Sequence, residues 1–269
     1  MDKIKKGLGR GLSSLIGENK IEPQQKYNGS SYYYANNPNL VFYDNLINEL
    51  IKNDIEPMIT LHHFTNPIWF DNIGSFEKDE NIQYFENFCE KIFTRYKSKI
   101  KYWCIFNEPI VYCFHGYLTG LFPPGKHNLS KSVNVLFQIY KYYVHTYKVL
   151  RNLDPEKNCL FGIAHNFTLF EPWNPNSRID KYISGVCHKY WNETFINFFK
   201  TGHFDFNYLP FVKVNKFIED APKTLDFVGI NYYTRLYSSF SSKNKYLIDL
   251  KKSPVEHDTK MPFLSLIHI

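Results

Sequence analysis

A carboxylate follows a strand-like segment in the middle of the chain. Residues 101–109 read Lys-Tyr-Trp-Cys-Ile-Phe-Asn-Glu-Pro, whose β-favouring residues predict a buried strand. Pro109 stops strand pairing and turns the chain just after Glu108. A glutamate at the carboxyl end of a strand, beside the amide of Asn107, can be presented into a cleft, as in α/β barrels. The alternative is an ordinary strand-end glutamate that is solvated or caps the next helix.

The spacing of apolar residues predicts the elements that would position Glu108. Helical spacing predicts a helix over residues 40–51, with positions 43, 46, 47, 50 and 51 on one face, and a helix over residues 82–97, with its apolar face at Phe85, Phe88, Cys89, Ile92, Phe93 and Tyr96. A long helix has core positions at Val135, Leu136, Ile139, Tyr143, Val144, Tyr147 and Leu150, and another helix covers about residues 180–200. Short apolar runs predict strands at residues 55–61, 159–164 and 225–233. This alternation is typical of parallel βα units with a site in the βα loops, so the predicted fold class is α/β.

Composition limits the classes of protein that fit. With 269 residues, 43% hydrophobic and 18% aromatic, the chain can bury a large core. The net charge of +6 is partly concentrated in the first twenty residues and does not predict a nucleic-acid surface. The odd number of cysteines, five without a CxxC pair, predicts mostly buried thiols in a reducing compartment, hence a cytoplasmic protein. No apolar run predicts a membrane span or a signal peptide.

Five motifs resemble those of glycoside hydrolase family one, in the family's order and at about its spacing. They are Ile21-Glu22-Pro23-Gln24; Thr60-Leu61-His62-His63-Phe64; residues 101–109; Gly116-Tyr117-Leu118-Thr119-Gly120 with Pro124-Gly125; and residues 226–234. The resemblance covers roughly residues 20–240. It implies a partial (β/α)8 barrel, about strands two to six, of a β-glucosidase-like enzyme that hydrolyses O-glycosidic bonds with retention. The implied partner is a β-glycoside or oligosaccharide, with no cofactor and no metal.

The resemblance also implies roles for individual residues. Retaining hydrolysis uses two carboxyl groups about 5 Å apart, one protonated and one ionised. Glu108 matches the family's acid/base and Asn107 the amide that binds the sugar 2-hydroxyl. His63 matches a histidine that binds a glycone hydroxyl, and its alternative role is a core histidine bonded to a backbone carbonyl. Asn231 and Tyr233 match a strand-six pair whose tyrosine holds the nucleophile ionised and oriented.

The chain also departs from the family pattern. The nucleophile's Thr-Glu-Asn-Gly motif is missing from it, and the glutamate that follows Tyr233, Glu256, lies in no strand-like segment. The family's first strand is absent as well. We therefore expect a fragment, truncated at both ends, that is poorly stable and inactive by itself because an incomplete barrel has open edges. Its last six residues resemble a translated sequencing adapter, so an artificial end is expected.

Three segments are predicted along the chain. Residues 1–20 form a basic flexible tail, residues 21–240 a partial TIM-barrel glycosidase domain, and residues 241–269 an irregular segment that an assembly artefact would explain. Residues 1–18 resemble the N-terminus of ParB-type chromosome-partition proteins, which implies a partition ATPase as partner. No DNA-binding domain follows, so a gene fusion or an assembly error is favoured over a partition function.

Other functions stay open from the sequence. One is a sugar-binding pseudoenzyme or dead fragment without the nucleophile. Another is a 6-phospho-β-glucosidase, because the family's phosphate-recognising residues lie in its C-terminal part, beyond the resemblance. We predict no nucleic-acid partner and no membrane association.

Overall fold

The computed structural model describes residues 38–251, and the chain divides into two compact units. The first unit comprises the chain up to Asn107 together with Tyr142–Ile163. The second comprises Glu108–Lys141 and the chain from Ala164 onward. The predicted tail at residues 1–20 and the motif at residues 21–24 lie outside the described residues, so the prediction of one domain over residues 21–240 stays a prediction.

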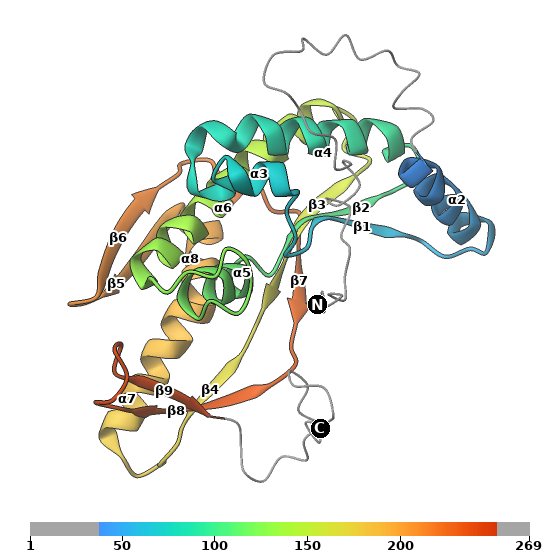
Figure 1. Cartoon of the computed structure of the whole chain (residues 1–269). Helices are drawn as coiled ribbons and strands as arrows, with labels where there is room; N and C mark the ends of the chain where they lie inside the picture. Colours follow the sequence, from blue (N-terminus) through green and yellow to red (C-terminus); the bar gives the residue numbers. More distant parts are fainter. Residues whose placement is uncertain (1–37, 252–269) are drawn as a thin grey trace, which may run out of the picture. The chain divides into compact units, whose positions relative to one another are not determined.

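The main sheet carries the strands that the sequence predicts. Its strands are hydrogen-bonded in the order β1 (Met58–His62), β2 (Tyr102–Asn107), β3 (Leu160–Asn166) and β7 (Phe227–Asn231) (Figure 1). In the first unit β1 and β2 are parallel, with Met58 opposite Tyr102 and His62 opposite Phe106. The fold is α/β, as the sequence predicts. Parallel strands bring their carboxyl ends to one edge, which is where Glu108 follows β2.

Helix α4 (Ile82–Tyr96) packs on β2 through its predicted apolar face. Phe85, Phe88, Cys89, Ile92, Phe93 and Tyr96 are all buried. The ring of Phe85 stacks on Phe106 with centroids 4.7 Å apart, and Phe93 meets Trp103 edge-on at 5.0 Å. The helical period of 3.6 residues aligns these side chains on one side of the helix, so the burial pattern follows from the local sequence.

Helix α2 (Pro38–Lys52) confirms the predicted helix but corrects its buried face. Ile47 is buried, whereas Leu46 and Ile51 are 42% and 41% exposed. Polar contacts add to the burial of Ile47: Asp44 is paired to Arg95, and Asn48 accepts a hydrogen bond of 2.7 Å from Lys99. Apolar spacing indicates a face that can be buried, but burial needs a neighbouring element that covers it.

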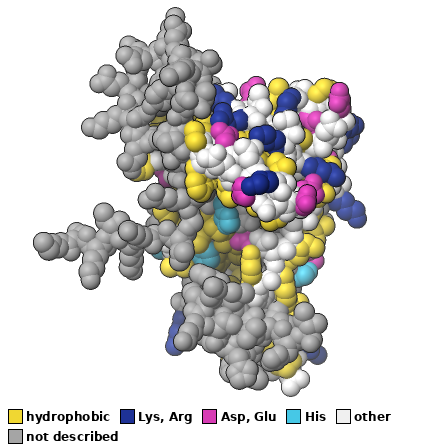
Figure 2. All heavy atoms as spheres, turned by 90° about the vertical axis from the view of Figure 1, so that its right-hand side faces the viewer, with side chains coloured by type: hydrophobic (Ala, Val, Ile, Leu, Met, Phe, Trp, Pro, Cys, Tyr) yellow, Lys and Arg dark blue, Asp and Glu magenta, His cyan; other side chains and the backbone are white. Residues whose placement is uncertain are grey.

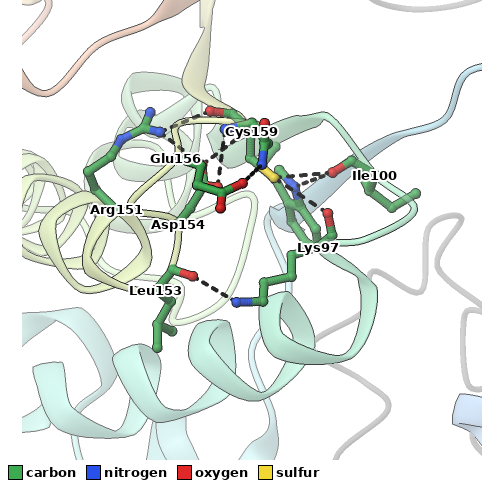
Figure 3. Close-up of polar contacts among 9 residues, drawn as sticks. Lys97, Ile100, Arg151, Leu153, Asp154, Glu156 and Cys159 are labelled. Atoms are coloured by element: carbon green, nitrogen blue, oxygen red, sulfur yellow. Dashed lines mark hydrogen bonds and ion pairs between the residues drawn. The ribbon is translucent and has the colours of Figure 1, made fainter.

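The turn before β3 is held by the carboxylate of Asp154 (Figure 3). One oxygen accepts from the Cys159 N–H at 2.9 Å and from the Arg151 guanidinium at 3.0 Å, and the other accepts from the Asn158 N–H at 3.1 Å. Lys97 donates to the carbonyl of Leu153 at 2.7 Å. Asp154 therefore satisfies two backbone N–H groups just before the strand that leads to the site.

Helix α6 (Leu129–Asn152) has residues in both units, and all seven of its predicted core positions are buried.

The helix predicted over residues 180–200 is three segments, α7 (Arg178–His188), the π-helical η5 (Lys189–Glu193) and α8 (Thr194–Thr201). Ser177 caps α7 by accepting from the Asp180 N–H at 3.2 Å, and α8 ends at Gly202 in the left-handed conformation. A second π-helical segment, η4 (Phe114–Leu118), follows the short α5 (Pro109–Cys113). The remaining short helices are α3 (Ile68–Asn72), η2 (Ser75–Glu77), η3 (Asp79–Asn81) and η6 (Ala221–Lys223).

The second unit also contains strands that the sequence reasoning did not find. Strands β4 (Leu169–Pro172), β8 (Arg235–Phe240) and β9 (Ile248–Lys251) form one sheet, with α7 against it (Figure 1). An antiparallel hairpin joins β5 (His203–Tyr208) to β6 (Val212–Phe217). Strand β9 corrects the expectation that residues 241–269 are irregular, because it pairs with β8. Residues 252–269 lie outside the described part.

On the face drawn in Figure 2, Lys and Arg side chains of the described residues are interspersed with Asp and Glu. Four of the five cysteines are buried, Cys187 is partly exposed, and all five are free thiols, which confirms the mostly buried thiols predicted from the sequence. Within residues 38–251, no helix is both long and apolar enough to span a membrane.

Candidate active site

Glu108 is held by its backbone at the junction between β2 and α5. Its N–H donates to the carbonyl of Ala164 at 2.7 Å, and its own carbonyl accepts from the N–H groups of Val111 and Tyr112 at 3.0 and 3.1 Å. The residue has φ 46° and ψ 58°, in the left-handed region that a β-carbon disfavours. Pro109 then begins α5 with the φ that a first helical turn requires. A strained non-glycine residue at a strand end is a feature of functional sites.

Two side-chain amides converge on one oxygen of the Glu108 carboxylate. Asn231, the last residue of β7, donates to Oε1 at 2.8 Å, and Asn166, the last residue of β3, donates to the same atom at 3.3 Å. Glu108 itself is 5% exposed. The two donors fix the rotation of the carboxylate, and no donor among the described residues bonds Oε2.

Asn166 was not among the predicted site residues, and its own contacts orient it. Its Oδ1 accepts from the Thr168 hydroxyl at 2.8 Å and from Trp191 Nε1 at 3.3 Å, so its Nδ2 is the atom directed at Glu108. Trp191 Nε1 also donates to the Asn166 backbone carbonyl at 2.8 Å. The signal for Asn166 was present in the sequence, because it is a polar residue two positions beyond the strand predicted at residues 159–164.

A small-residue contact brings the end of β7 close to β3. A β-carbon on Gly229 would lie 3.0 Å from the Ala164 Cβ, nearer than side chains normally approach. The strands therefore come together at these two small residues, and the Phe167 N–H donates to the carbonyl of Asn231 at 2.9 Å. Asn231 lies two residues beyond Gly229, on the same face of the strand, which directs its amide to Glu108.

Tyr233 lies two residues beyond Asn231 and is 41% exposed. Partial burial and the negative charge of Glu108 both raise the pKa of its phenol. The influence of that charge places Tyr233 in the electrostatic surroundings of Glu108, and the phenol stays neutral and able to donate a hydrogen bond at neutral pH.

The other two predicted site residues belong to the first unit. Asn107 is the last residue of β2 and is 8% exposed. His63 is exposed just beyond β1, with its ring 4.9 Å from Phe64, so the alternative of a core histidine does not apply to it. The buried histidine is its neighbour His62, which bonds Asn66 at 3.1 Å and whose pKa burial lowers to about 4. Within residues 38–251, no group of three His, Cys, Asp or Glu side chains could hold a metal ion.

Comparison with known sequences identifies relatives over most of the chain. The family model for glycosyl hydrolase family 1 matches residues 27–262. Beta-glucosidase 33 of Arabidopsis thaliana is 30% identical over 242 residues, which are 81% of this chain and 39% of that protein. The 6-phospho-beta-glucosidase GmuD of Bacillus subtilis is 28% identical over 71% of this chain and 43% of its own length. The chain thus spans about two fifths of the length of these relatives.

Solved structures show the same fold. The GH1 beta-glucosidase of Exiguobacterium antarcticum superposes with a TM-score of 0.75 at 23% identity, over 85% of this chain and 53% of that one. At this identity the likeness establishes the (β/α)8 barrel fold rather than the activity. The family match over residues 27–262 goes further, and it shows that this chain belongs to glycosyl hydrolase family 1.

Proposed function

We propose that the whole protein is a retaining β-glycosidase that hydrolyses β-glucoside-like substrates, with Glu108 as its acid/base. The observation that carries the proposal is the environment of Glu108, which is buried at a strand end. Among residues 38–251, two side-chain amides donate to its Oε1 and none donates to its Oε2. Protonated at Oε2, the carboxylic acid would donate to the leaving glycosidic oxygen. After departure of the aglycone, the same carboxylate would take the proton of the attacking water.

The remaining predicted residues have roles that this chemistry requires. Asn107 would donate to the sugar 2-hydroxyl, a contact that strengthens at the oxocarbenium-like transition state. His63 would bind a glycone hydroxyl. Asn231 orients the acid/base, and Tyr233 would hold the ionised carboxylate that attacks the anomeric carbon. That second carboxylate belongs to the family's Thr-Glu-Asn-Gly motif, which the 269 residues do not contain. The chain therefore contributes the acid/base half of the pair.

A phosphorylated sugar is the second candidate substrate. The proposal rests on the relative named 6-phospho-beta-glucosidase, which matches 71% of this chain. Both candidates share the acid/base chemistry at Glu108 and differ in what binds the sugar 6-position. A pair of aryl β-glucosides, with and without a 6-phosphate, separates them by the ratio of their kcat/KM values.

The test uses the protein expressed from its own gene with its flanking sequence, as wild type and as Glu108→Gln. We expect hydrolysis in which NMR detects the β-anomer first, and a loss of about 10²- to 10⁴-fold in kcat/KM for the variant, because the amide cannot deliver a proton. Release of the α-anomer first would contradict retention. Sugar binding without any turnover would instead support the alternative of a pseudoenzyme.

The 269-residue chain by itself is proposed to be a fragment without turnover. The reason is the missing nucleophile motif. Long-read sequencing across both ends of the reading frame tests this directly. A continuation into Thr-Glu-Asn-Gly would support the enzyme, and unchanged ends would support the dead fragment or the pseudoenzyme.

Two finer proposals concern partners and compartment. We propose a β-glycoside and no nucleic acid as partner; on the face drawn in Figure 2, the basic side chains of the described residues are mixed with acidic ones. The free thiols support a reducing compartment such as the cytoplasm.

Residues 1–18 would recruit a partition ATPase, if the ParB-like resemblance reflects a function. Pull-down of that ATPase by this segment, and its loss when the basic residues become alanine, tests the idea.

A further inference from the structure

A cavity of about 230 Å³ lies within the second unit, apart from the predicted site residues. The α5–η4 segment, the first turns of α6, and the α7–η5 segment each contribute to its wall. Neither Glu108 nor Asn231 nor Tyr233 lines it. Both π-helical segments of the second unit border this space, through Phe114 of η4 and Trp191 of η5. Such segments occur frequently at functional sites.

The walls of the cavity are predominantly apolar, and aromatic rings form a large share of them. Phe114, Phe170, Tyr190, Trp191, Phe206 and Tyr208 supply rings, and aliphatic side chains such as Val133 and Leu136 of α6 fill in between them. Aromatic faces and edges favour contact with another ring, in stacked or edge-on geometry. The chemistry of the wall therefore selects an apolar, ring-containing occupant.

The polar groups of the wall already have partners within the protein. The hydrogen bonds run from Ser132 Oγ to the Cys113 carbonyl (2.9 Å), from Tyr190 OH to the Asn207 carbonyl (2.6 Å), from Tyr208 OH to the Tyr246 carbonyl (2.7 Å), and from the Leu129 N–H to Tyr246 OH (3.2 Å). Trp191 Nε1 is bonded to Asn166. A buried water needs two to four polar partners, and this wall offers it few. An apolar molecule that displaces water from this space therefore breaks few hydrogen bonds between water and the wall.

We propose that this cavity is a binding site for a neutral aromatic molecule of one or two rings. An apolar cavity of about 150 Å³ is known to bind benzene, so this space of about 230 Å³, which is partly open to solvent, accommodates a single ring and leaves room for a second. A sugar fits this wall poorly, because the wall offers its hydroxyl groups few hydrogen-bond partners. The inference does not depend on the proposed glycosidase activity.

Trp191 connects the cavity to the candidate active site. Its ring forms part of the wall, and its Nε1 bonds both the carbonyl and Oδ1 of Asn166. Asn166 in turn donates to Glu108. An aromatic ligand in contact with the Trp191 ring changes the surroundings of the atom that orients Asn166, and the side-chain amide of Asn166 reports that change.

Fluorobenzene is the probe, with the protein expressed from its own gene with its flanking sequence. We expect a saturable change in its ¹⁹F signal, a rise in Tm with ligand concentration, and a shift of the Asn166 side-chain amide resonance in ¹⁵N NMR. Val133→Phe places a ring in the cavity and should raise the Kd at least tenfold. Val149→Phe makes the same substitution on the same helix outside the cavity wall and should leave the Kd unchanged.

The outcomes separate clearly. Leu136→Phe serves as a second filling variant, and circular dichroism confirms that each variant is folded. The absence of saturable binding to the wild type overturns the site. An unchanged Kd in both folded filling variants places the ligand elsewhere and overturns it equally. Binding without any shift of the Asn166 amide overturns the connection to the active site.

Discussion

At the scale of single residues, the backbone conformation of Glu108 predicts a difference in stability between two variants, which can be measured without any assay of activity. Glu108→Gly and Glu108→Ala both remove the carboxylate and its two hydrogen bonds. They differ at φ 46°, which glycine adopts freely and alanine does not. We expect the glycine variant to be more stable than the alanine variant by about 1 kcal/mol in urea unfolding. Equal stabilities, or a more stable alanine variant, would contradict the strained conformation.

Asn166 is a positioning residue, and introducing a negative charge at its position tests that role. Asn166→Asp places a second carboxylate beside Glu108, and a like charge disfavours ionisation of its neighbour. If the protein is a glycosidase, we expect the pH–rate profile to move to higher pH on its basic side, where the acid form of Glu108 is lost. Asn176→Asp, at an exposed position of the second unit, should leave the profile in place. A fall in kcat with an unmoved profile would indicate a structural role instead.

His165 makes the stability of the fold depend on pH. Its ring is fully buried and stacked on Phe195 at 4.3 Å, and burial lowers its pKa from 6.5 to about 3. The unfolded chain binds a proton below pH 6.5 and the folded chain does not until about pH 3. The free energy of unfolding therefore falls as the pH drops through this window, by up to about 1.4 kcal/mol per pH unit for each such histidine.

We expect His165→Gln to flatten this part of the stability curve, because glutamine stays neutral and can still donate to the Trp191 carbonyl that the ring approaches at 3.0 Å. Urea unfolding at pH 7 and pH 5 measures the difference. His203→Gln, at an exposed position, is the matched control. An identical pH dependence in wild type and His165→Gln would show that His165 does not carry the effect and would direct attention to His62 and His115, whose pKa values burial also lowers.

At the scale of elements, the Asp154 turn is expected to be a main support of β3. Asp154→Ala leaves the N–H groups of Asn158 and Cys159 without their acceptor, and a lost buried partner costs about 1–3 kcal/mol. We expect the free energy of unfolding to fall by that amount. Glu156→Ala removes an exposed carboxylate from the same turn and should change stability by less than about 0.5 kcal/mol. Comparable losses in the two variants would contradict the assignment.

At the scale of the whole molecule, β7 presents apolar side chains to solvent. Val228 and Ile230 are 40% and 72% exposed, whereas strands of parallel sheets are normally covered on both faces. We expect the 269-residue chain to self-associate through this surface. Ile230→Thr should reduce light scattering without lowering Tm, and Ile163→Thr, at a fully buried position of β3, should lower Tm. Undiminished scattering by Ile230→Thr would place the association elsewhere.

Much of this molecule was determined by local sequence. The helices α4 and α6 and the predicted strands of the main sheet follow from periodicity, because a helix or strand places its apolar residues on one side wherever it lies. The β-favouring residues before Glu108 and the proline after it likewise predicted that Glu108 lies at the end of a strand. The family resemblance added the roles of Asn107, His63, Asn231 and Tyr233, which remain proposals.

The tertiary structure decided which of these residues meet. Glu108 lies 58 positions from Asn166 and 123 from Asn231, and no periodic pattern encodes contacts over such separations. It also decided that His62 rather than His63 is buried, that α2 leaves part of its apolar face exposed, and that β9 pairs with β8. Each of these outcomes depends on which distant element supplies the covering surface or the hydrogen-bond partner. A sequence determines what each segment is able to bury or bond, and packing in three dimensions determines what it does bury and bond.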